Sequence, residues 1–276
     1  MLPGTFINRE ALELATLTWP GTGTPLYLVH ATGFCGALWD PIAGAVAART
    51  APRAMDVRGH GRSSKPDRDY PWQLFADDLL DWIRSEEDGP IFAMGHSSGA
   101  TAVALAAAQE PERFERILLI DPTILPPRAE RSEDEQRGGF GLADRAARRR
   151  GRFDSRQSVR ESYHERFPFS SWDPRVFELY LEHAVVVDGE ARLRCPPELE
   201  SRIYLGTAAI DPWPELGMIR ARTRIVLPEH SGLRPELQRR LEQALPHAEI
   251  VRTEGTHFVP MERPDQIARL ALEHFS

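Results

Sequence analysis

The residues best suited to chemistry in this 276-residue chain lie in the segment Gly95-His96-Ser97-Ser98-Gly99. An apolar run that suits a buried strand precedes this G-x-S-x-G pattern, and a run of small residues that suits a helix follows it. A serine in this position is typical of a nucleophile held on a sharp strand-to-helix turn, where only small neighbours fit. The helix N-terminus also offers free N–H groups and a dipole that favour developing negative charge. The pattern therefore predicts a nucleophilic Ser97, and its context disfavours a glycine-rich turn without chemistry.

The elements that must position this serine are indicated by apolar runs that alternate with helical patterns, which is typical of an α/β protein. The runs predict buried strands at 25–31, 53–57, 91–96, 117–121, 223–227 and 248–253. The helical patterns fall at 73–84, 98–109, 234–245 and 265–275. An alternating stretch at 12–19 predicts a half-exposed antiparallel strand at the edge of the sheet.

The alternation stops after Asp121. Residues 122–215 contain no convincing apolar strand run and carry two Pro-Pro pairs and charged, helix-like segments. We therefore predict a core formed by residues 1–121 and 220–276. Residues 122–219 are predicted to form a mostly helical cap insertion over the carboxyl ends of the strands.

An arginine-rich segment, Arg145–Arg152, lies inside the predicted cap. It suits either a phosphate-binding patch or a solvated helix whose charge is offset by nearby acidic residues. Those acidic residues are Asp144, Asp154, Glu161 and Glu165. The solvated helix is favoured, because the net charge of the chain opposes phosphate binding.

Composition excludes several function classes. Lys and Arg number 34 against 41 Asp and Glu, a formal net charge of −7, which argues against nucleic acid as a partner. Two cysteines, Cys35 and Cys195, are too few for a disulfide framework or a cysteine-bound metal, which favours a reducing compartment. The N-terminal residues show no secretory signal, and no apolar run approaches the roughly 18 residues of a membrane span. We expect a cytoplasmic globular protein without membrane contact. The composition does not predict its oligomeric state.

The G-x-S-x-G turn at Ser97, which we call the elbow, and three further segments resemble the α/β-hydrolase family. Leu28–Phe34 resembles its first sheet loop, Asp56–Ser64 matches its D-x-R-G-x-G-x-S turn, and Glu254–Pro264 resembles its G-x-H-F-x-x-x-E-x-P segment. The resemblance covers residues 23–121 and 220–275, and the cap matches nothing specific. It implies the α/β-hydrolase fold, a mostly parallel sheet flanked by helices, here with a helical cap insertion.

The resemblance also assigns roles around Ser97. It makes His257 the general base, placed to take the serine proton and return it to the leaving group. It places two backbone N–H groups in an oxyanion hole, those of Phe34 and Ser98. The family usually reads His-Gly-aromatic where this chain reads His-Ala-Thr-Gly-Phe, so the register of the Phe34 match shifts by a residue or two.

The triad acid has two candidates, because members of the family carry it after either the sixth or the seventh strand. Asp121 ends the predicted strand 117–121. Glu229 follows the next strand, close to where many members carry an aspartate and this chain has Ser231. Asp121 is favoured because it needs no register shift, and Glu229 is the alternative.

These residues predict a serine hydrolase that cleaves a small-molecule carboxylic ester through an acyl-enzyme on Ser97. The resemblance implies neither a metal nor an organic cofactor. A serine nucleophile disfavours the epoxide hydrolases and haloalkane dehalogenases of the family, which use a carboxylate. Hydrolysis of C–C bonds, lactones or amides and acyl transfer use the same residues and are alternatives. A ligand-binding member without catalysis is a less favoured one.

Overall fold

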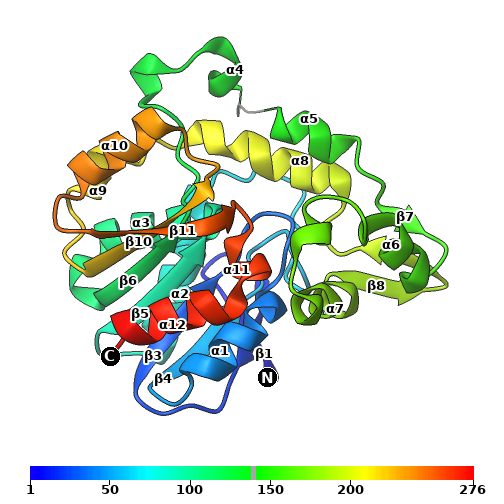
Figure 1. Cartoon of the computed structure of the whole chain (residues 1–276), viewed down its shortest axis with the longest axis horizontal. Coiled ribbons are helices and arrows are strands. Elements are labelled where there is room, and N and C mark those ends of the chain that lie inside the picture. The colour runs from blue at the N-terminus through cyan, green and yellow to red at the C-terminus, as the bar shows by residue number, and fades with distance from the viewer. Residues whose placement is uncertain (138–140) are drawn as a thin grey trace.

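The computed structural model of the chain describes residues 1–137 and 141–276 and contains an eight-stranded sheet of order β1-β2-β4-β3-β5-β6-β10-β11 (Figure 1). The pairs β1–β2 and β2–β4 are antiparallel, and the other neighbours are parallel. The strands are β1 Leu2–Ile7, β2 Glu13–Thr18, β3 Thr24–Val29, β4 Thr50–Met55, β5 Ile91–His96, β6 Phe114–Ile120, β10 Arg222–His230 and β11 Glu249–Thr256. This confirms the predicted fold class, a mostly parallel sheet flanked by helices.

Helices cover both faces of the sheet. Leu26 and Leu28 of β3 pack in one hydrophobic cluster with α1 and α12, while Tyr27 and Val29 pack in a second cluster with α2 and α3. This alternation is expected of a strand that is buried on both faces. The helices of the core are η1 Gly36–Trp39, α1 Asp40–Val46, α2 Gln73–Glu86, α3 Ser98–Gln109, η2 Pro111–Arg113, α10 Pro235–Ala244, α11 Val259–Glu262 and α12 Pro264–His274.

The edge of the sheet differs from the prediction. The alternating stretch at 12–19 contains the antiparallel strand β2, but β1 pairs with its outer side and is itself the edge strand. The sequence of β1, Leu-Pro-Gly-Thr-Phe-Ile, is almost entirely exposed and has no apolar alternation by which it could be recognised.

The region predicted to be a cap arches over one end of the sheet, where it is coloured green to yellow in Figure 1. Its helices are η3 Arg128–Glu130, α4 Glu133–Gln136, α5 Leu142–Ala147, α6 Arg156–Tyr163, η4 Phe169–Ser171, α7 Pro174–His183, α8 Pro197–Leu205, η5 Gly206–Ala209 and α9 Trp213–Leu216. The described part of this region is mostly helical, but it also contains strands for which the sequence showed no apolar run. It holds a three-stranded antiparallel sheet of order β7-β9-β8, with β7 Arg152–Phe153, β8 Val185–Asp188 and β9 Glu190–Leu193. These strands are only two to four residues long, too short to give an apolar run.

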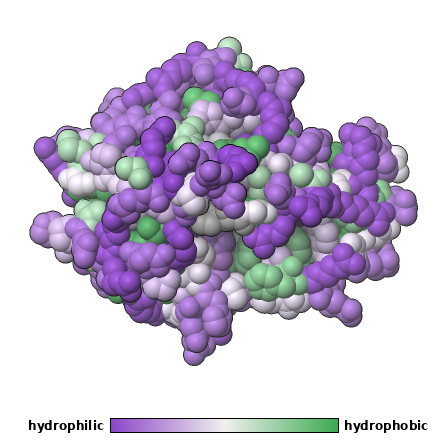
Figure 2. Space-filling view, turned by 90° about the horizontal axis from the view of Figure 1, so that it is seen from above, coloured by the Kyte–Doolittle hydropathy of each residue, from purple (hydrophilic) through white to green (hydrophobic). Residues whose placement is uncertain are grey.

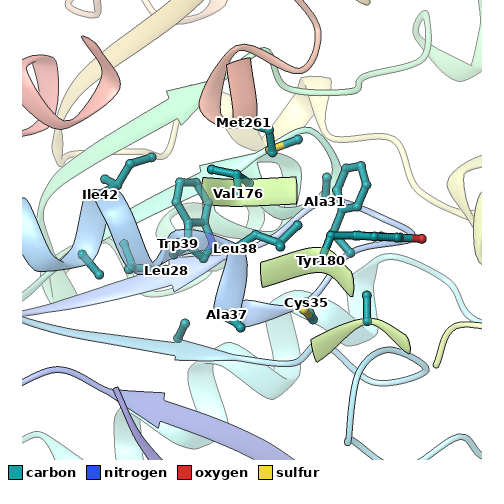
Figure 3. Packing of buried hydrophobic residues seen from close by; sticks show 14 of the residues in the cluster. Leu28, Ala31, Cys35, Ala37, Leu38, Trp39, Ile42, Val176, Tyr180 and Met261 are labelled. Carbon is teal, nitrogen blue, oxygen red and sulfur yellow. The ribbon is translucent and has the colours of Figure 1, made fainter. Parts of the chain in front are cut away.

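The cap packs on the core through one shared hydrophobic cluster. Val176 and Tyr180 of α7 lie against Leu38 and Trp39 of η1, with Met261 of α11 beside them (Figure 3). All five side chains are at most 5 % exposed. The shared cluster fixes the position of α7 over the core.

The outer surface is dominated by polar side chains. Figure 2 shows a mostly hydrophilic face, on which hydrophobic residues gather in small separate patches. None of the helices in the described ranges is both long and apolar enough to cross a lipid bilayer. Cys35 and Cys195 are both free and buried.

Candidate active site

Ser97 lies on the sharp turn between β5 and α3. Its φ is +56°, a left-handed conformation that costs a serine backbone strain. The turn closes because its glycines leave room for backbone contacts. A Cβ on Gly95 would lie 2.4 Å from the carbonyl oxygen of Gly99, and one on Gly99 would lie 2.2 Å from that of Val29. The strand-to-helix turn that the G-x-S-x-G pattern predicts is therefore present.

Ser97, His257 and Asp121 form one continuous line of hydrogen bonds. Nε2 of His257 lies 2.9 Å from Oγ of Ser97, and Nδ1 of His257 lies 2.6 Å from Oδ2 of Asp121. With Asp121 ionised, Nδ1 carries the proton and donates it to the carboxylate, so Nε2 is free to accept from the serine hydroxyl. The arrangement can move a proton from Ser97 to His257.

Asp121 is buried in a site built for a carboxylate. Its Oδ2 accepts a hydrogen bond from the N–H of Gly232 at 2.8 Å, and its Oδ1 accepts one from the hydroxyl of Ser231. Burial by itself raises the pKa of the Asp121 carboxyl. The hydrogen bond and charge of His257, with the bonds from Ser231 and Gly232, outweigh burial and hold that pKa below its ordinary value.

The structure does not bring Glu229 to His257. Glu229 is exposed near the end of β10, and the residues that follow it turn back toward Asp121. In this close approach a Cβ on Gly232 would lie 2.8 Å from Nδ1 of His257. The segment after β10 therefore supplies hydrogen-bond donors to the carboxylate of Asp121, not a carboxylate of its own.

The two backbone N–H groups predicted to form the oxyanion hole, those of Ser98 and Phe34, differ in whether they already donate a hydrogen bond. Ser98 is the first residue of α3, so no preceding turn of the helix offers an acceptor for its N–H. The N–H of Phe34 is already used, because it donates to the carbonyl of Ala31 at 3.2 Å and closes a turn through Gly33. The assignment of the Phe34 N–H to the oxyanion hole therefore stays a prediction. The N–H of Thr32, in the same loop, donates to the Ser98 hydroxyl at 2.9 Å.

Two more side chains touch the triad, and the sequence analysis gave neither of them a role. His96 is buried and its Nε2 lies 2.7 Å from the carbonyl oxygen of His257. Burial, followed by the charge of His257, lowers the pKa of His96 to about 3, so the neutral ring donates Nε2–H to that carbonyl and holds the backbone of His257. Oγ1 of Thr123 lies 3.0 Å from Oγ of Ser97. Both contacts join residues far apart in the sequence, and no local motif signals them.

A cavity of about 500 Å3 opens above Ser97, between the core and the cap. Aromatic side chains from both regions form much of its wall, and three arginines and one glutamate add charge. The lining includes Phe34, Phe258, Tyr163, Phe167, Phe169, Tyr204, Arg145, Arg149, Arg166 and Glu200. Such a cavity suits a small organic substrate with both apolar and anionic parts.

The arginines of this cavity differ in what they bind. Arg149 is fully engaged, since it donates to Glu200 at 2.8 Å, to the Tyr163 hydroxyl at 3.1 Å and to the Tyr180 hydroxyl at 2.5 Å. The guanidinium of Arg166 is exposed. Within the described ranges it has no hydrogen-bond or ion-pair partner. Arg166 is therefore available to a ligand.

Activity is expected to fall at acid pH, because a general base must be unprotonated to accept a proton from Ser97. Asp121 does not cause this fall, because its lowered pKa keeps it ionised where an ordinary carboxyl begins to protonate. The stability that Asp121 contributes is present above its unfolded pKa and is lost only as the pH falls through its lower folded value. The measurements are a pH profile of kcat/KM and thermal melting over the same range. A profile that stays flat into the acid range would remove His257 as the base.

Comparison with known proteins shows that the sequence of this chain is similar to those of hydrolases. Residues 26–270 match the sequence profile of the alpha/beta hydrolase family. The 2-(acetamidomethylene)succinate hydrolase of Mesorhizobium japonicum is 33% identical over 122 residues, which are 43% of this chain and 44% of that protein. The chain thus matches less than half the length of this relative.

Solved structures match over nearly the whole chain. The crystal structure of E-2-(acetamidomethylene)succinate hydrolase superposes with a TM-score of 0.86 at 22% identity, covering 99% of this chain and 98% of that one. A thioesterase domain from the curacin biosynthetic pathway gives a TM-score of 0.82 at 21% identity, with 99% of both chains covered. At these identities the two structures show a common fold.

Proposed function

The chain belongs to the alpha/beta hydrolase family, and on this premise we propose that it is a serine hydrolase that cleaves a carboxylic ester through an acyl-enzyme. The observation that carries the proposal is the hydrogen-bonded line from Ser97 through His257 to the buried Asp121. A serine hydroxyl is a weak nucleophile near neutral pH and needs such a base to act.

The proposed reaction proceeds in two steps. Ser97 Oγ attacks the ester carbonyl while Nε2 of His257 takes its proton, and the N–H of Ser98 donates to the oxyanion that forms. The protonated His257 then gives that proton to the departing alcohol, which leaves Ser97 acylated. Water attacks the acyl carbon with His257 again as base, and this step releases the carboxylic acid and regenerates Ser97.

A fluorophosphonate probe tests the proposal. An activated Ser97 displaces fluoride and becomes phosphonylated, and intact-protein and peptide mass spectrometry then locate the adduct. A panel of esters with acyl chains of increasing length reports turnover. A ligand-binding protein without catalysis would leave the probe unreacted and the esters intact, and this result would refute the proposal.

Amide hydrolysis is a second candidate, and the relative from Mesorhizobium japonicum favours it. That protein is named as a hydrolase of an acetamidomethylene compound, and an acetamido group is an amide. The leaving nitrogen of an amide needs the proton of His257 more than an alcohol does. Turnover of an ester and an amide with the same acyl group separates the two candidates.

We further propose that the substrate carries a carboxylate, which Arg166 binds. The cavity above Ser97 contains three arginines and a single glutamate, and that glutamate is paired with Arg149. An arginine can hold a carboxylate through two parallel hydrogen bonds. The name of the relative supports this proposal, since succinate is a dicarboxylate.

Arg166→Gln is expected to raise KM for an ester that carries a carboxylate by about tenfold to a hundredfold, which corresponds to the 1.5–3 kcal/mol of a charged hydrogen bond. The KM of a neutral ester of equal size should stay within about twofold, because Arg166 does not touch Ser97. Arg239→Gln on the exposed side of α10 is the matched control. Equal changes in KM for both esters would contradict a carboxylate-binding role.

A further inference from the structure

A second cavity, of about 730 Å3, lies apart from Ser97 and is lined by residues of three separate segments. The segments are the core loop at 61–65, the end of α5 with the residues up to β7, and the strands and loop at 186–198. Arg149 lines both this cavity and the one above Ser97, so the two cavities lie on either side of that side chain.

Positive charge dominates this second cavity. Its lining includes six cationic side chains and one carboxylate, that of Glu198. The cations are Lys65, Arg149, Arg150, Arg152, Arg192 and Arg194. Only some of them are neutralised, since Arg149 pairs with Glu200 and Arg152 pairs with Glu190. In a chain of net charge −7, such a concentration of cations calls for a physical reason.

The small sheet of the cap brings like charges together. Arg152 of β7 and Arg192 of β9 are direct partners in the antiparallel register, so their side chains leave the same face of the sheet. Like charges directly opposite each other destabilise a strand pair. Arg192 therefore lies opposite a like charge, whose repulsion a bound anion would offset.

Arg192 and Arg194 each also have a buried polar atom without a hydrogen-bond partner among the described residues. In both residues this atom is the Nε of the guanidinium. Burial, followed by the charge of Arg62, lowers the pKa of Arg194, and the opposing charge of Asp56 does not outweigh them. A buried donor without an acceptor costs free energy, and an anion bound beside these two guanidiniums would accept from both.

The acidic residues that were expected to offset the charge of the segment Arg145–Arg152 form few ion pairs with it. Of Asp144, Asp154, Glu161 and Glu165, only Asp144 forms an ion pair with it in the described structure, at 3.9 Å from Arg148. The solvated helix that the sequence favours therefore fits Arg148. In contrast, Arg149, Arg150 and Arg152 line the second cavity.

We propose that this second cavity binds an anion that carries a diphosphate group. Guanidiniums donate in a planar fork that matches phosphate oxygens, and two or more of them around one cavity suit a ligand with several charges. The volume exceeds that of a single phosphate and leaves room for an organic group attached to the diphosphate. This proposal does not depend on the function proposed for Ser97.

Inorganic pyrophosphate and ADP are the probes, because they share the diphosphate and differ in the organic group. Isothermal titration calorimetry of the full chain at constant ionic strength should give a Kd below about 1 mM for at least one of them, and thermal melting should rise with ligand concentration. Tighter binding of ADP would identify an organic diphosphate, and equal binding would identify the diphosphate alone. Citrate at the same ionic strength should bind at least tenfold more weakly. If neither probe gives a heat of binding or a rise in Tm beyond that of sodium chloride at the same ionic strength, the proposal is wrong.

Arg192→Gln combined with Arg194→Gln should weaken the tighter-binding probe at least tenfold, and Arg192→Lys with Arg194→Lys should recover part of the loss by keeping the charges. Arg239→Gln, which removes an exposed cation elsewhere, should leave the Kd unchanged. Thermal melting without added ligand should stay cooperative in all these variants, which shows that they fold. Unaltered binding in the glutamine pair would overturn the proposal, since the diphosphate would then lie elsewhere.

Discussion

Ser97→Ala is expected to lower kcat for ester hydrolysis by about five to six orders of magnitude, as removal of a triad serine does in a hydrolase of this kind. The proposed mechanism forms its covalent intermediate on this oxygen, so neither His257 nor Asp121 can replace it. The variant should also stop reacting with a fluorophosphonate. Steady-state kinetics with enzyme in high concentration and mass spectrometry of the labelled protein measure the two effects.

The loss in Ser97→Ala should not come from unfolding. Alanine adopts the φ of +56° with strain similar to that of serine, and the elbow glycines are unchanged, so the Tm should move by no more than a few degrees. Ser98→Ala is the matched control, because it removes the neighbouring hydroxyl and keeps the backbone N–H proposed for the oxyanion. Its kcat should stay within about tenfold of the original. A Ser97→Ala protein that keeps a tenth of the activity would remove Ser97 from the mechanism.

The parts of the fold and site that could be predicted from the sequence are those encoded by neighbouring residues. The glycines that permit the turn at Ser97 are two positions away on either side, so a five-residue pattern contains the whole requirement. The buried strands were visible because a strand covered on both faces must be apolar along its length.

What could not be predicted depends on residues distant in the sequence or on hydrogen bonds that no side chain signals. The hydrogen bond of the Phe34 N–H to Ala31 is set by the local turn, and the pattern His-Ala-Thr-Gly-Phe does not indicate which amide stays free. The second cavity forms because Arg192 and Arg194 line the same space as Arg150, and the strands β7 and β9 that bring these segments together are too short to recognise. Asp188-Gly189, a common hairpin-turn pair, was the one local signal for those strands.

Asp121→Asn should cost about three to four orders of magnitude in kcat, or roughly 4–5.5 kcal/mol of transition-state stabilisation. Asparagine can keep the φ of +41° at this position, because it tolerates left-handed backbone. It cannot, however, stabilise the imidazolium that forms when Ser97 attacks. Its amide can also donate to Nδ1 of His257, which would select the tautomer that carries the proton on Nε2, where the base must accept one.

Glu229→Gln tests the alternative hypothesis that Glu229 is the triad acid, because it removes the carboxylate that the sequence offered in place of Asp121. Glu229 is exposed and has no contact with His257, so its amide variant should keep kcat within about twofold. The two variants should also respond differently to pH. At alkaline pH Asp121→Asn should recover part of its rate, as hydroxide replaces the missing general base, while Glu229→Gln should follow the profile of the unaltered protein. If Glu229→Gln lost more than a hundredfold in kcat and Asp121→Asn did not, the acid would be Glu229, and the end of β10 would have to move to reach His257.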